Sequence, residues 1–377
     1  ALIYGHYDVQ PGEPLDEWST PPFEPVIIHD ILYGRGATDD KGQLYTQIKA
    51  IEALLKTKGT LPVNVKFCLE GEEEIASPNL APFLEQNLEL LSADLIVISD
   101  GPMLDEDTPS ICYGLRGIAG FELKVQGPSQ DLHSGLYGGG VANPVTALVE
   151  LLASMRDANG RITIEGFYDN VHILSEEERA LFARLPFDEK KVAESLNVPE
   201  LAGEAGFSYM ERTTARPTLE INGIYGGYQG EGLKPIVPAT AGAKLSCRLV
   251  DGQDPDDIFD LIERHIERHK PAGVTVTMER THRGKPYYIR PDHPYIQAAA
   301  KAYETGFGKP PVFIRSGGSI PIIEVFSRQL KVPVVMMDFG FPSDNMHSPN
   351  EHFALSCFDN GIRTLCNFWQ RLAETRS

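Results

Sequence analysis

The sequence predicts an α/β fold, in which a mostly parallel sheet carries helices on both faces and a second, α+β domain is inserted into the first. Three observations indicate this. The chain has 377 residues, more than the roughly 250 to 300 at which single hydrophobic cores stop growing. Its first and last parts alternate short apolar runs with segments of helical period. Its middle part alternates apolar and polar residues, as half-buried strands do.

Four short apolar runs are predicted to be strands, and each of them ends at an acid or a histidine. ALIYGH ends at His6, and VNVKFCLEGEEE ends in residues 70–74. ADLIVISD ends at Asp100, and VPVVMMDFGFPSDNMHS reaches Asp338 and then His347. Ligands of open parallel sheets bind beyond the carboxyl ends of the strands. These polar residues are therefore expected to lie where a ligand binds.

The segment between the first two strands, GATDDKGQLYTQIKAIEALLKTKG, is predicted to form a helix. Leu44, Ile48, Ile51 and Leu55 recur at the spacing of one helix face, and Gly59 closes the segment. Repeated strand, helix and strand segments of this kind imply a largely parallel sheet.

The middle of the chain predicts a different architecture. GIAGFELKVQG, GAKLSCRLV and GVTVTMER are expected to be strands, while Asn-Pro and Asp-Pro open two predicted helices, ANPVTALVELLASM and DPDDIFDLIERHIERH. Residues 117–284 are therefore predicted to form an inserted α+β domain, and residues 1–116 and 285–377 the domain around it. The acidic, turn-rich stretch 175–206 is expected to be a surface excursion of the insert.

Composition excludes several classes of function. A net charge of -19 argues against a nucleic-acid surface, which needs clustered Lys and Arg. No apolar stretch approaches the ~20 residues that span a bilayer, so no membrane contact is expected. The five cysteines are odd in number and form no CxxC, so they predict reduced core residues in a cytoplasmic protein. Because the chain begins without Met inside a predicted strand, we expect a further segment to precede it.

Each strand-end motif has an ordinary structural interpretation when it is taken alone. His6 and Asp8 could be polar residues of a loop, and Asp39 and Asp40 in TDDKG could face the dipole at a helix N-terminus. EGEEE could be a solvated turn, and His347 could be a surface histidine.

Taken together, these motifs predict a metal centre. Two imidazoles and three carboxylates at one sheet edge suit divalent ions with nitrogen and oxygen ligands, zinc first among them. Two ions that share a carboxylate would use all five groups, and Asp39 is a natural bridge. Asp8 would accept the other ring N–H of His6 and fix its tautomer. Of Glu73 and Glu74, one would bind an ion and the other would take the proton of the attacking water.

Eight motifs follow one another along the chain: YGHYDVQP, LYGRGATDDKG, FCLEGEEE, VISDGP, YGLRG, DLHSGLYGG, SGGSIP and MHSPNE. In this order they resemble the cytosolic non-specific dipeptidase and carnosinase group of dinuclear zinc or manganese peptidases, relatives of aminoacylase and glutamate carboxypeptidase. The resemblance covers nearly the whole chain. It implies a catalytic domain interrupted by a lid that also forms a homodimer.

The resemblance also implies roles for the predicted site. His6, Asp39 and Asp100 would hold one ion, and Asp39, Glu74 and His347 the other. Glu73 would then be the general base. The peptide bond between Asp39 and Asp40 would be cis.

Further residues are expected at the substrate. His133 in DLHSG would reach the partner subunit's site and stabilise the oxyanion, although it could also be a polar turn residue. Arg248 in CRLV would bind the C-terminal carboxylate of the substrate, or else form a structural ion pair. Ser319, with Gly318 beside it, would contact the same end of the substrate, and His282 would contact it too.

The chain departs from the family's pattern at three places. Gly101-Pro102 stand where Asn and an aromatic are common, Ser316 replaces an acid before the glycine pair, and Pro235 replaces a threonine. The metal chemistry is unaffected by these changes, but a requirement for a free substrate N-terminus is placed in question.

The predicted function is the hydrolysis of peptide bonds in dipeptides or short peptides by a water that two metal ions activate. One alternative is an amidohydrolase of N-acyl or N-carbamoyl amino acids, since the same ions cleave any amide placed over them. A non-catalytic binding protein of the same fold is a further alternative, but it predicts the loss of a ligand or of the base, and the sequence shows none.

Overall fold

The structure, a computed structural model, describes residues 1–318 and 320–374. Its first sheet consists of four strands in the order β15-β5-β1-β4, all of them parallel. They are β1 (Leu2–His6), β4 (Lys66–Glu70), β5 (Ile96–Ile98) and β15 (Val334–Met336). The predicted parallel sheet is thus confirmed, with β1 beside β4 and β5.

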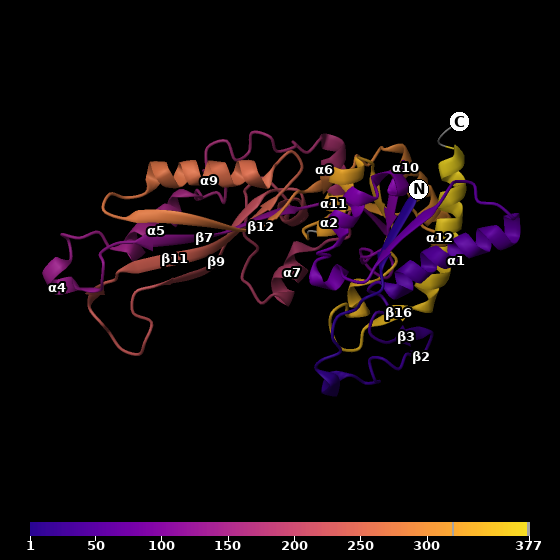
Figure 1. The fold of residues 1–377 in the computed structure, drawn as a ribbon, viewed down its shortest axis with the longest axis horizontal. Helices are drawn as coiled ribbons and strands as arrows, with labels where there is room; N and C mark the ends of the chain where they lie inside the picture. Colours follow the sequence, from indigo (N-terminus) through magenta and orange to yellow (C-terminus); the bar gives the residue numbers. More distant parts are fainter. Residues whose placement is uncertain (319, 375–377) are drawn as a thin grey trace.

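Helices cover both faces of this sheet (Figure 1). A side chain on Gly5 would meet Leu44 of α1 within 2.8 Å, whereas the ring of the preceding Tyr4 packs edge-on against Phe326 of α11. Successive strand residues point to opposite faces, so α1 and α11 lie on opposite sides. The helices of this part are α1 (Lys41–Lys58), α2 (Leu80–Gln86), α3 (Leu88–Leu91), α10 (Pro294–Phe307), α11 (Pro321–Leu330) and α12 (Leu355–Glu374).

Helix α1 ends where the sequence predicts, because Gly59 follows it with a φ of 74°. Its buried face differs in part from the expectation. Leu44 and Ile51 are buried, but Ile48 and Leu55 are exposed. Because α1 packs against α12 as well as β1, its buried stripe also takes in small and polar residues, which a count of apolar positions does not mark.

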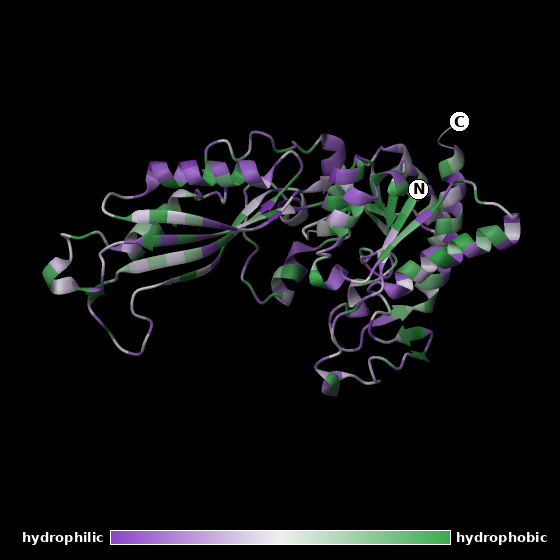
Figure 2. Ribbon diagram, in the orientation of Figure 1, coloured by the Kyte–Doolittle hydropathy of each residue, from purple (hydrophilic) through white to green (hydrophobic). Residues whose placement is uncertain are grey.

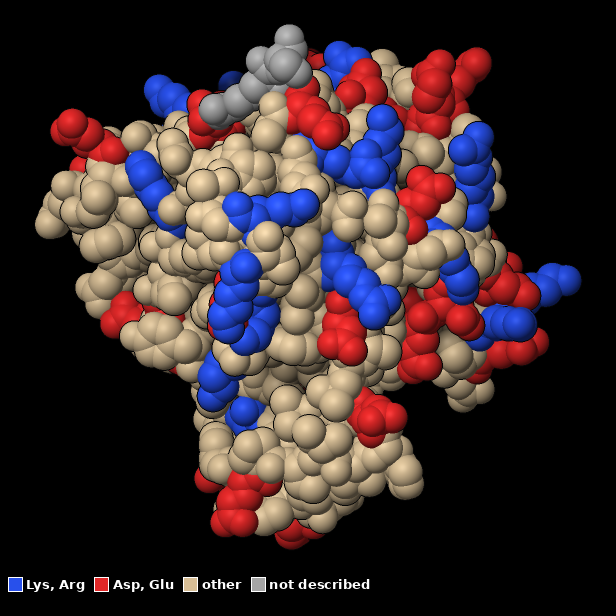
Figure 3. Space-filling model, turned by 90° about the vertical axis from the view of Figure 1, so that its right-hand side faces the viewer, with Lys and Arg blue, Asp and Glu red and all other residues tan. Residues whose placement is uncertain are grey.

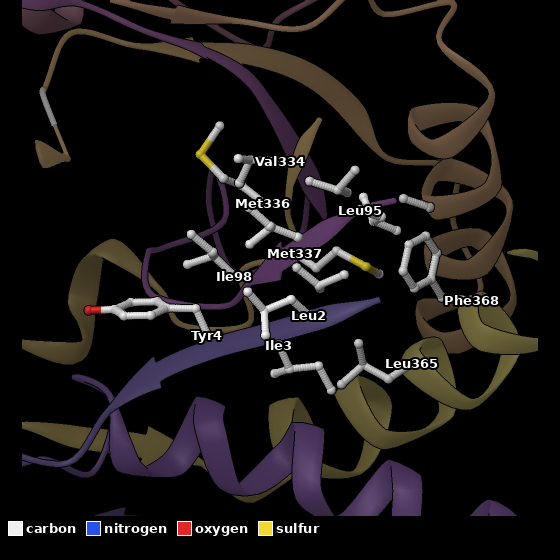
Figure 4. Close-up of a cluster of buried hydrophobic side chains, with 14 of the residues drawn as sticks. Leu2, Ile3, Tyr4, Leu95, Ile98, Val334, Met336, Met337, Leu365 and Phe368 are labelled. Atoms are coloured by element: carbon white, nitrogen blue, oxygen red, sulfur yellow. The ribbon is translucent and has the colours of Figure 1, made fainter. Parts of the chain in front are cut away.

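A cluster of apolar side chains fills the space between the sheet and the helices (Figure 4). The whole of β1 is buried, and Leu2 and Ile3 lie among Leu95, Leu365 and Phe368. The strands of this sheet are accordingly among the most hydrophobic elements of the molecule (Figure 2). A core of this kind holds the carboxyl ends of the strands in fixed positions.

Two small sheets and several short elements of the first and last parts were not predicted. One sheet has the order β13-β6-β14 and the other β16-β3-β2. Their strands are β2 (Val26–Ile28), β3 (Ile31–Tyr33), β6 (Ser110–Leu115), β13 (Tyr287–Tyr288), β14 (Val312–Ser316) and β16 (His352–Ala354), and the 3₁₀ turns are η1 (Leu15–Glu17), η2 (Glu73–Ile75) and η3 (Pro342–Asp344). Most of these elements have two or three residues, too few to show a period.

The middle of the chain forms an antiparallel sheet in the order β12-β7-β11-β9. Its strands are β7 (Gly117–Gln126), β9 (Thr218–Gly226), β11 (Thr240–Leu249) and β12 (Thr275–Gly284). Helices α5 (Pro144–Ser154) and α9 (Pro255–His269) pack on it and enclose a second hydrophobic core. The short elements β8 (Leu132–His133), α4 (Ser134–Tyr137) and β10 (Ile236–Val237) lie at its far end (Figure 1).

The α+β character of the insert is confirmed, and so are its two predicted helix starts. Asn143 accepts hydrogen bonds from the backbone N–H of Val145 and Thr146, and Asp254 accepts one from Asp256. Residues 117–284 as the limits of a separate domain stay a prediction.

Stretch 175–206 is mostly exposed, as expected of a surface excursion, but part of it is buried against the first domain. It forms α6 (Glu176–Ala183) and α7 (Glu189–Ser195), and α8 (Tyr209–Thr214) follows. Phe182 of α6 lies in a small core beside β14. The many acids of the stretch predict an exposed segment. One of them, Glu178, is instead buried, because it pairs with Arg315 of β14.

On the face formed by α1 and α12, acidic and basic side chains are interspersed (Figure 3). None of the described helices is both long and apolar enough to span a membrane.

Candidate metal centre and active site

Three of the predicted ligands follow neighbouring strands of the parallel sheet. His6 is the last residue of β1, Asp100 comes two residues after β5, and Glu74 comes four residues after β4. Because β1 pairs with both β4 and β5, the carboxyl ends of all three strands meet at one edge. The topology therefore brings together residues that are far apart in the sequence.

The first group of ligands consists of His6, Asp39 and Asp100. Nε2 of His6 lies 3.1 Å from Oδ1 of Asp39 and 3.4 Å from Oδ1 of Asp100. One ligand atom from each residue lies within 4.8 Å of the others, as a shared metal ion requires.

The second group consists of Asp39, Glu74 and His347. Nε2 of His347 lies 2.8 Å from Oδ2 of Asp39 and 3.2 Å from Oε2 of Glu74. Asp39 thus belongs to both groups and offers a different carboxylate oxygen to each histidine. This is the arrangement that a carboxylate bridging two ions needs.

The chemistry of these donors fits two divalent cations. Burial raises the pKa of Asp100 and of Glu74, and the negative charge of Asp39 adds to both shifts. Burial alone would lower the pKa of His6, but its contacts with Asp100 and Asp39 outweigh this and raise it to about 12. The cluster therefore holds more negative charge than its own histidines offset. Cations at its centre would neutralise that charge.

Asp8 lies between the two groups. Its Oδ1 is 3.3 Å and its backbone oxygen 3.1 Å from Nδ1 of His6, the ring nitrogen that faces away from Asp39. Its Oδ2 accepts the backbone N–H of Glu74 at 3.0 Å. Asp8 is therefore placed to orient a residue of each group, as outer partners of metal ligands do.

Glu351 is a supporting residue to which sequence reasoning assigned no role. Its carboxylate is fully buried and accepts the backbone N–H groups of Gly36, Thr38 and Asp39 and a 2.8 Å bond from Arg35. It thereby holds the loop that carries Asp39, whose peptide bond to the next residue is cis, as expected. The motif MHSPNE contained this glutamate, but nothing in the motif said what it binds.

Two more buried acids and an amide complete the support. Asp40 accepts the backbone N–H of His6, and Asp338, two residues after β15, accepts that of Asp100. Gln10 donates from its side chain to Glu74 at 2.7 Å. The sequence placed Asp338 at the end of an apolar run, as it did Asp100, but assigned it no contact at the centre.

Glu73 lies in the 3₁₀ turn η2 beside Glu74. Burial raises its pKa to about 7, and the charge of Asp100 adds to that shift. Glu74 contacts His347, whereas Glu73 makes no such contact among the interactions of the described residues. The geometry thus favours Glu74 as the ligand and leaves Glu73 beside it as a carboxylate that can take up a proton near neutral pH.

The predicted substrate residues lie outside this cluster. His133 is exposed and caps α4, at the end of the insert opposite to α1 and α12 (Figure 1). His282 is exposed on β12, and Arg248 lies on β11. Gly318 follows β14, and its N–H is bonded to the side chain of Ser316. Ser319 lies outside the described residues.

Comparison with known proteins decides the family. The model of peptidase family M20/M25/M40 matches residues 2–371. The chain belongs to this family. It is 34% identical over 380 residues to the Cys-Gly metallodipeptidase dug1 of Schizosaccharomyces pombe, covering 99% of this chain and 80% of that protein. It is 33% identical to the human Beta-Ala-His dipeptidase, with 99% and 75% covered.

A solved structure supports the same assignment for the fold of this M20 peptidase. An M20 family metallo-carboxypeptidase from Sulfolobus solfataricus superposes with a TM-score of 0.80 at 34% identity, covering 99% of this chain and 85% of that one. The predicted resemblance, fold class and enzyme class are therefore confirmed: the chain is a metal-dependent peptidase with an α/β fold.

Proposed function

We propose that this M20 peptidase hydrolyses the peptide bond of dipeptides and short peptides with two divalent cations. Zinc is the metal we propose, with manganese as the alternative. One observation carries the proposal. Asp39 presents one carboxylate oxygen to His6 and the other to His347, so a single residue joins two groups of ligands. When bound, the cations would polarise the scissile carbonyl and lower the pKa of water.

The residues of the chain supply the proton transfers. Glu73 accepts a proton from the attacking water and passes it to the leaving amine, because its pKa of about 7 allows both states near neutral pH. The backbone oxygen of Asp8 keeps the ring of His6 in place through its contact with Nδ1. Glu351 holds the loop of Asp39.

The substrate is proposed to bind between the two parts of the molecule. Arg248 would pair with the C-terminal carboxylate of the substrate, with Gly318, Ser319 and His282 as further contacts. Residues 117–284 would act as the lid that brings Arg248 to the metal centre.

The position of His133 supports a homodimer formed through this lid. In its own chain His133 lies at the far end of the insert from the parallel sheet (Figure 1). A role at the oxyanion therefore requires that it enter the site of a second subunit. Gly135 donates its N–H to Nδ1 of His133, which leaves Nε2 to face a ligand.

One observation favours a second candidate, the hydrolysis of N-acyl or N-carbamoyl amino acids. Ser316 replaces an acid that would bind a substrate amino group, and its hydroxyl accepts the N–H of Gly318 at 3.1 Å. A substrate without a free amino group would lose nothing at this position. A non-catalytic protein is not favoured, because every predicted ligand is in place.

The predicted cytoplasmic location rests on the cysteines. All five are free thiols, as is usual in a reducing compartment.

The experiment is a substrate panel with a matched pair of variants. The metal-loaded protein is assayed with dipeptides, tripeptides and N-acetyl amino acids, and Glu73→Gln is compared with Glu72→Gln, an adjacent glutamate that binds Asn79 instead. We expect the wild-type protein to cleave dipeptides. Glu73→Gln should abolish this cleavage while it keeps its metal content, and Glu72→Gln should stay active. Substantial activity of fully loaded Glu73→Gln would refute the role of this residue. Cleavage of acetylated substrates alone would favour the second candidate.

A further inference from the structure

Residues 316–318 lie at the end of β14 and include Gly318, one of the proposed substrate contacts. We call them the 316–318 loop. Arg116 donates hydrogen bonds to the backbone oxygens of all three residues, at 3.1 to 3.3 Å. Gly317 lies so close to α8 that a side chain there would meet the backbone oxygen of Thr213 at 2.5 Å. The loop is therefore closely enclosed, and its position depends on how the end of β14 is held.

Arg315, the residue before this loop, is buried, with its side chain only 4% exposed. Its guanidinium group lies over two rings, with Cζ 5.1 Å from the centroid of Tyr113 and 4.6 Å from that of Tyr288. These tyrosines come from β6 and β13, the other two strands of the same sheet. A side chain on Gly114 would come within 3.3 Å of Cγ of Arg315. Because a cation is attracted to the face of an aromatic ring, these contacts hold the guanidinium group in one orientation.

Glu178 is the partner of Arg315, and it comes from α6, which packs on β14 where the insert meets the part that carries the parallel sheet (Figure 1). Its Oε1 accepts hydrogen bonds from Arg315 and from the hydroxyl of Tyr288, the latter at 3.2 Å. Its Oε2 lies 3.0 Å from Nε2 of His172 and accepts the backbone N–H of Ser175 at 3.2 Å. The carboxylate therefore has partners at both oxygens, and the cap of α6 fixes its position.

The two charges of this pair match one another. Burial alone would raise the pKa of Glu178, but the hydrogen bond with His172 and the charge of Arg315 outweigh it and lower the pKa. Both groups are therefore ionised near neutral pH. A buried ion pair adds little net stability, because the desolvation of both charges offsets their attraction. It does fix a geometry, since separating the partners would leave a buried charge unpaired, which costs far more.

From this geometry we infer that Arg315 and Glu178 are positioning residues for substrate binding: their pairing holds the 316–318 loop where Gly318 meets the C-terminal end of the substrate. The inference rests on the proposed function and adds to it two residues that belong to neither group of metal ligands. A misplacement of about 1 Å can cost an enzyme up to about a hundredfold in rate. The loss of one contact among several corresponds to about tenfold in binding.

The test separates substrate binding from chemistry. The values of kcat and KM for Ala-Leu are measured with the metal-loaded full chain, for the wild type and for Glu178→Gln, which keeps the size of the side chain but removes its charge. We expect KM to rise about tenfold and kcat to change less than about twofold, because the metal ligands and Glu73 are untouched. A purely structural role would lower the active fraction, and thus kcat, at an unchanged KM. That result, or no change in either value, would overturn the inference.

A second variant covers the case in which Glu178→Gln fails to fold because it leaves the buried charge of Arg315 unpaired. The double variant that combines Glu178→Gln with Arg315→Met removes both charges of the pair and should fold. Methionine has no planar cationic group to lie over the two tyrosine rings, so KM for Ala-Leu should again be about tenfold higher than in the wild type. A wild-type KM in the folded double variant would overturn the inference.

Glu177→Gln is the matched control for the change on α6, because this neighbouring glutamate is exposed. Arg290→Met is the control for the second change, since Arg290 is exposed and pairs with Asp292. Both controls should keep the KM of the wild type. A KM that rises as much in Glu177→Gln as in Glu178→Gln would contradict the inference while leaving the peptidase activity established.

Hydrogen exchange separates this inference from the proposed function, because it needs no substrate. Backbone amide exchange is followed by mass spectrometry in fragments that contain residues 312–318. These fragments should exchange at least about fivefold faster in Glu178→Gln than in the wild type, whereas fragments of α12 should not change. If the wild type cleaves no dipeptide but the exchange differs in this way, the proposed function fails and the positioning of the loop stands. Equal exchange at residues 312–318 in both proteins would contradict the inference in either case.

Discussion

The two halves of the candidate metal centre share Asp39 but differ in the burial of their histidines. The side chain of His6 is fully buried and that of Asp100 is 9% exposed, whereas that of His347 is 57% exposed. His6 ends a core strand and Asp100 follows another. His347 lies in a loop and has a φ of 61°, a conformation that few residues other than glycine adopt.

The two groups of ligands are held in position by different interactions. The sheet sets the position of the buried half, because hydrophobic packing on both of its faces holds the strand ends. In the second half, hydrogen bonds from the loop after β1 set the position of Glu74, which is held by Gln10 and Asp8. The first half should therefore be coupled to the stability of the fold, and the second half mainly to metal binding.

The largest expected effect is on activity, and it comes from replacing either histidine. His6→Ala and His347→Ala should each lower kcat/KM at least about a hundredfold, because each removes a metal ligand. Only His6→Ala should also destabilise the metal-free protein, by about 3 kcal/mol, since it leaves buried carboxylates unpaired. Urea unfolding measures this, with the exposed His29→Ala as the control. Equal losses of stability in the two variants would contradict the comparison.

Glu351→Gln tests whether the loop of Asp39 needs its buried carboxylate. The change keeps the shape of the side chain but removes the negative charge that faces Arg35. It also replaces one of the two oxygens that accept hydrogen bonds from three backbone N–H groups. We expect a loss of about 3 kcal/mol in the free energy of unfolding and weaker metal binding, measured by urea unfolding and by titration with zinc. Unchanged metal affinity would show that the loop holds Asp39 without this residue.

The smallest effect concerns the insert. Burial lowers the pKa of His265 to about 4, and the charge of His269 adds to this. An unfolded chain takes up this proton near pH 6.5, so the folded state loses stability as the pH falls from about 6.5 toward 4. In His265→Gln this loss should be smaller by about 1 to 2 kcal/mol, measured as the difference in unfolding free energy between pH 7 and 4.5. An identical pH dependence in both proteins would contradict the shift.

Much of the fold could be predicted because it depends on residues that are close together in the sequence. The strand that ends at His6, the helix that Gly59 closes, and the helix starts at Asn143 and Asp254 depend on period and capping alone. The packing of α6 on β14 could not be predicted. It depends on a buried pair, Glu178 and Arg315, whose members are 137 residues apart and look like surface residues in the sequence.

In the candidate site, too, some residues could be predicted from local patterns and others depend on contacts between distant segments. His6 ends a strand, and Asp100 and Glu74 follow two others, so their positions could be predicted from the apolar runs before them. The supporting carboxylate of Glu351 and the amide of Gln10 occupy no special position in any local pattern, because their partners come from distant segments.

The most direct test of the central claim is the number of metal ions bound per chain. The metal-free protein is titrated with zinc, and the bound metal is counted by elemental analysis after removal of the excess. We expect two ions per chain in the wild type, one in His347→Ala, and fewer than two in Asp39→Asn, which loses charge at the shared residue. A wild-type protein that is folded and active with one ion or none would contradict this expectation.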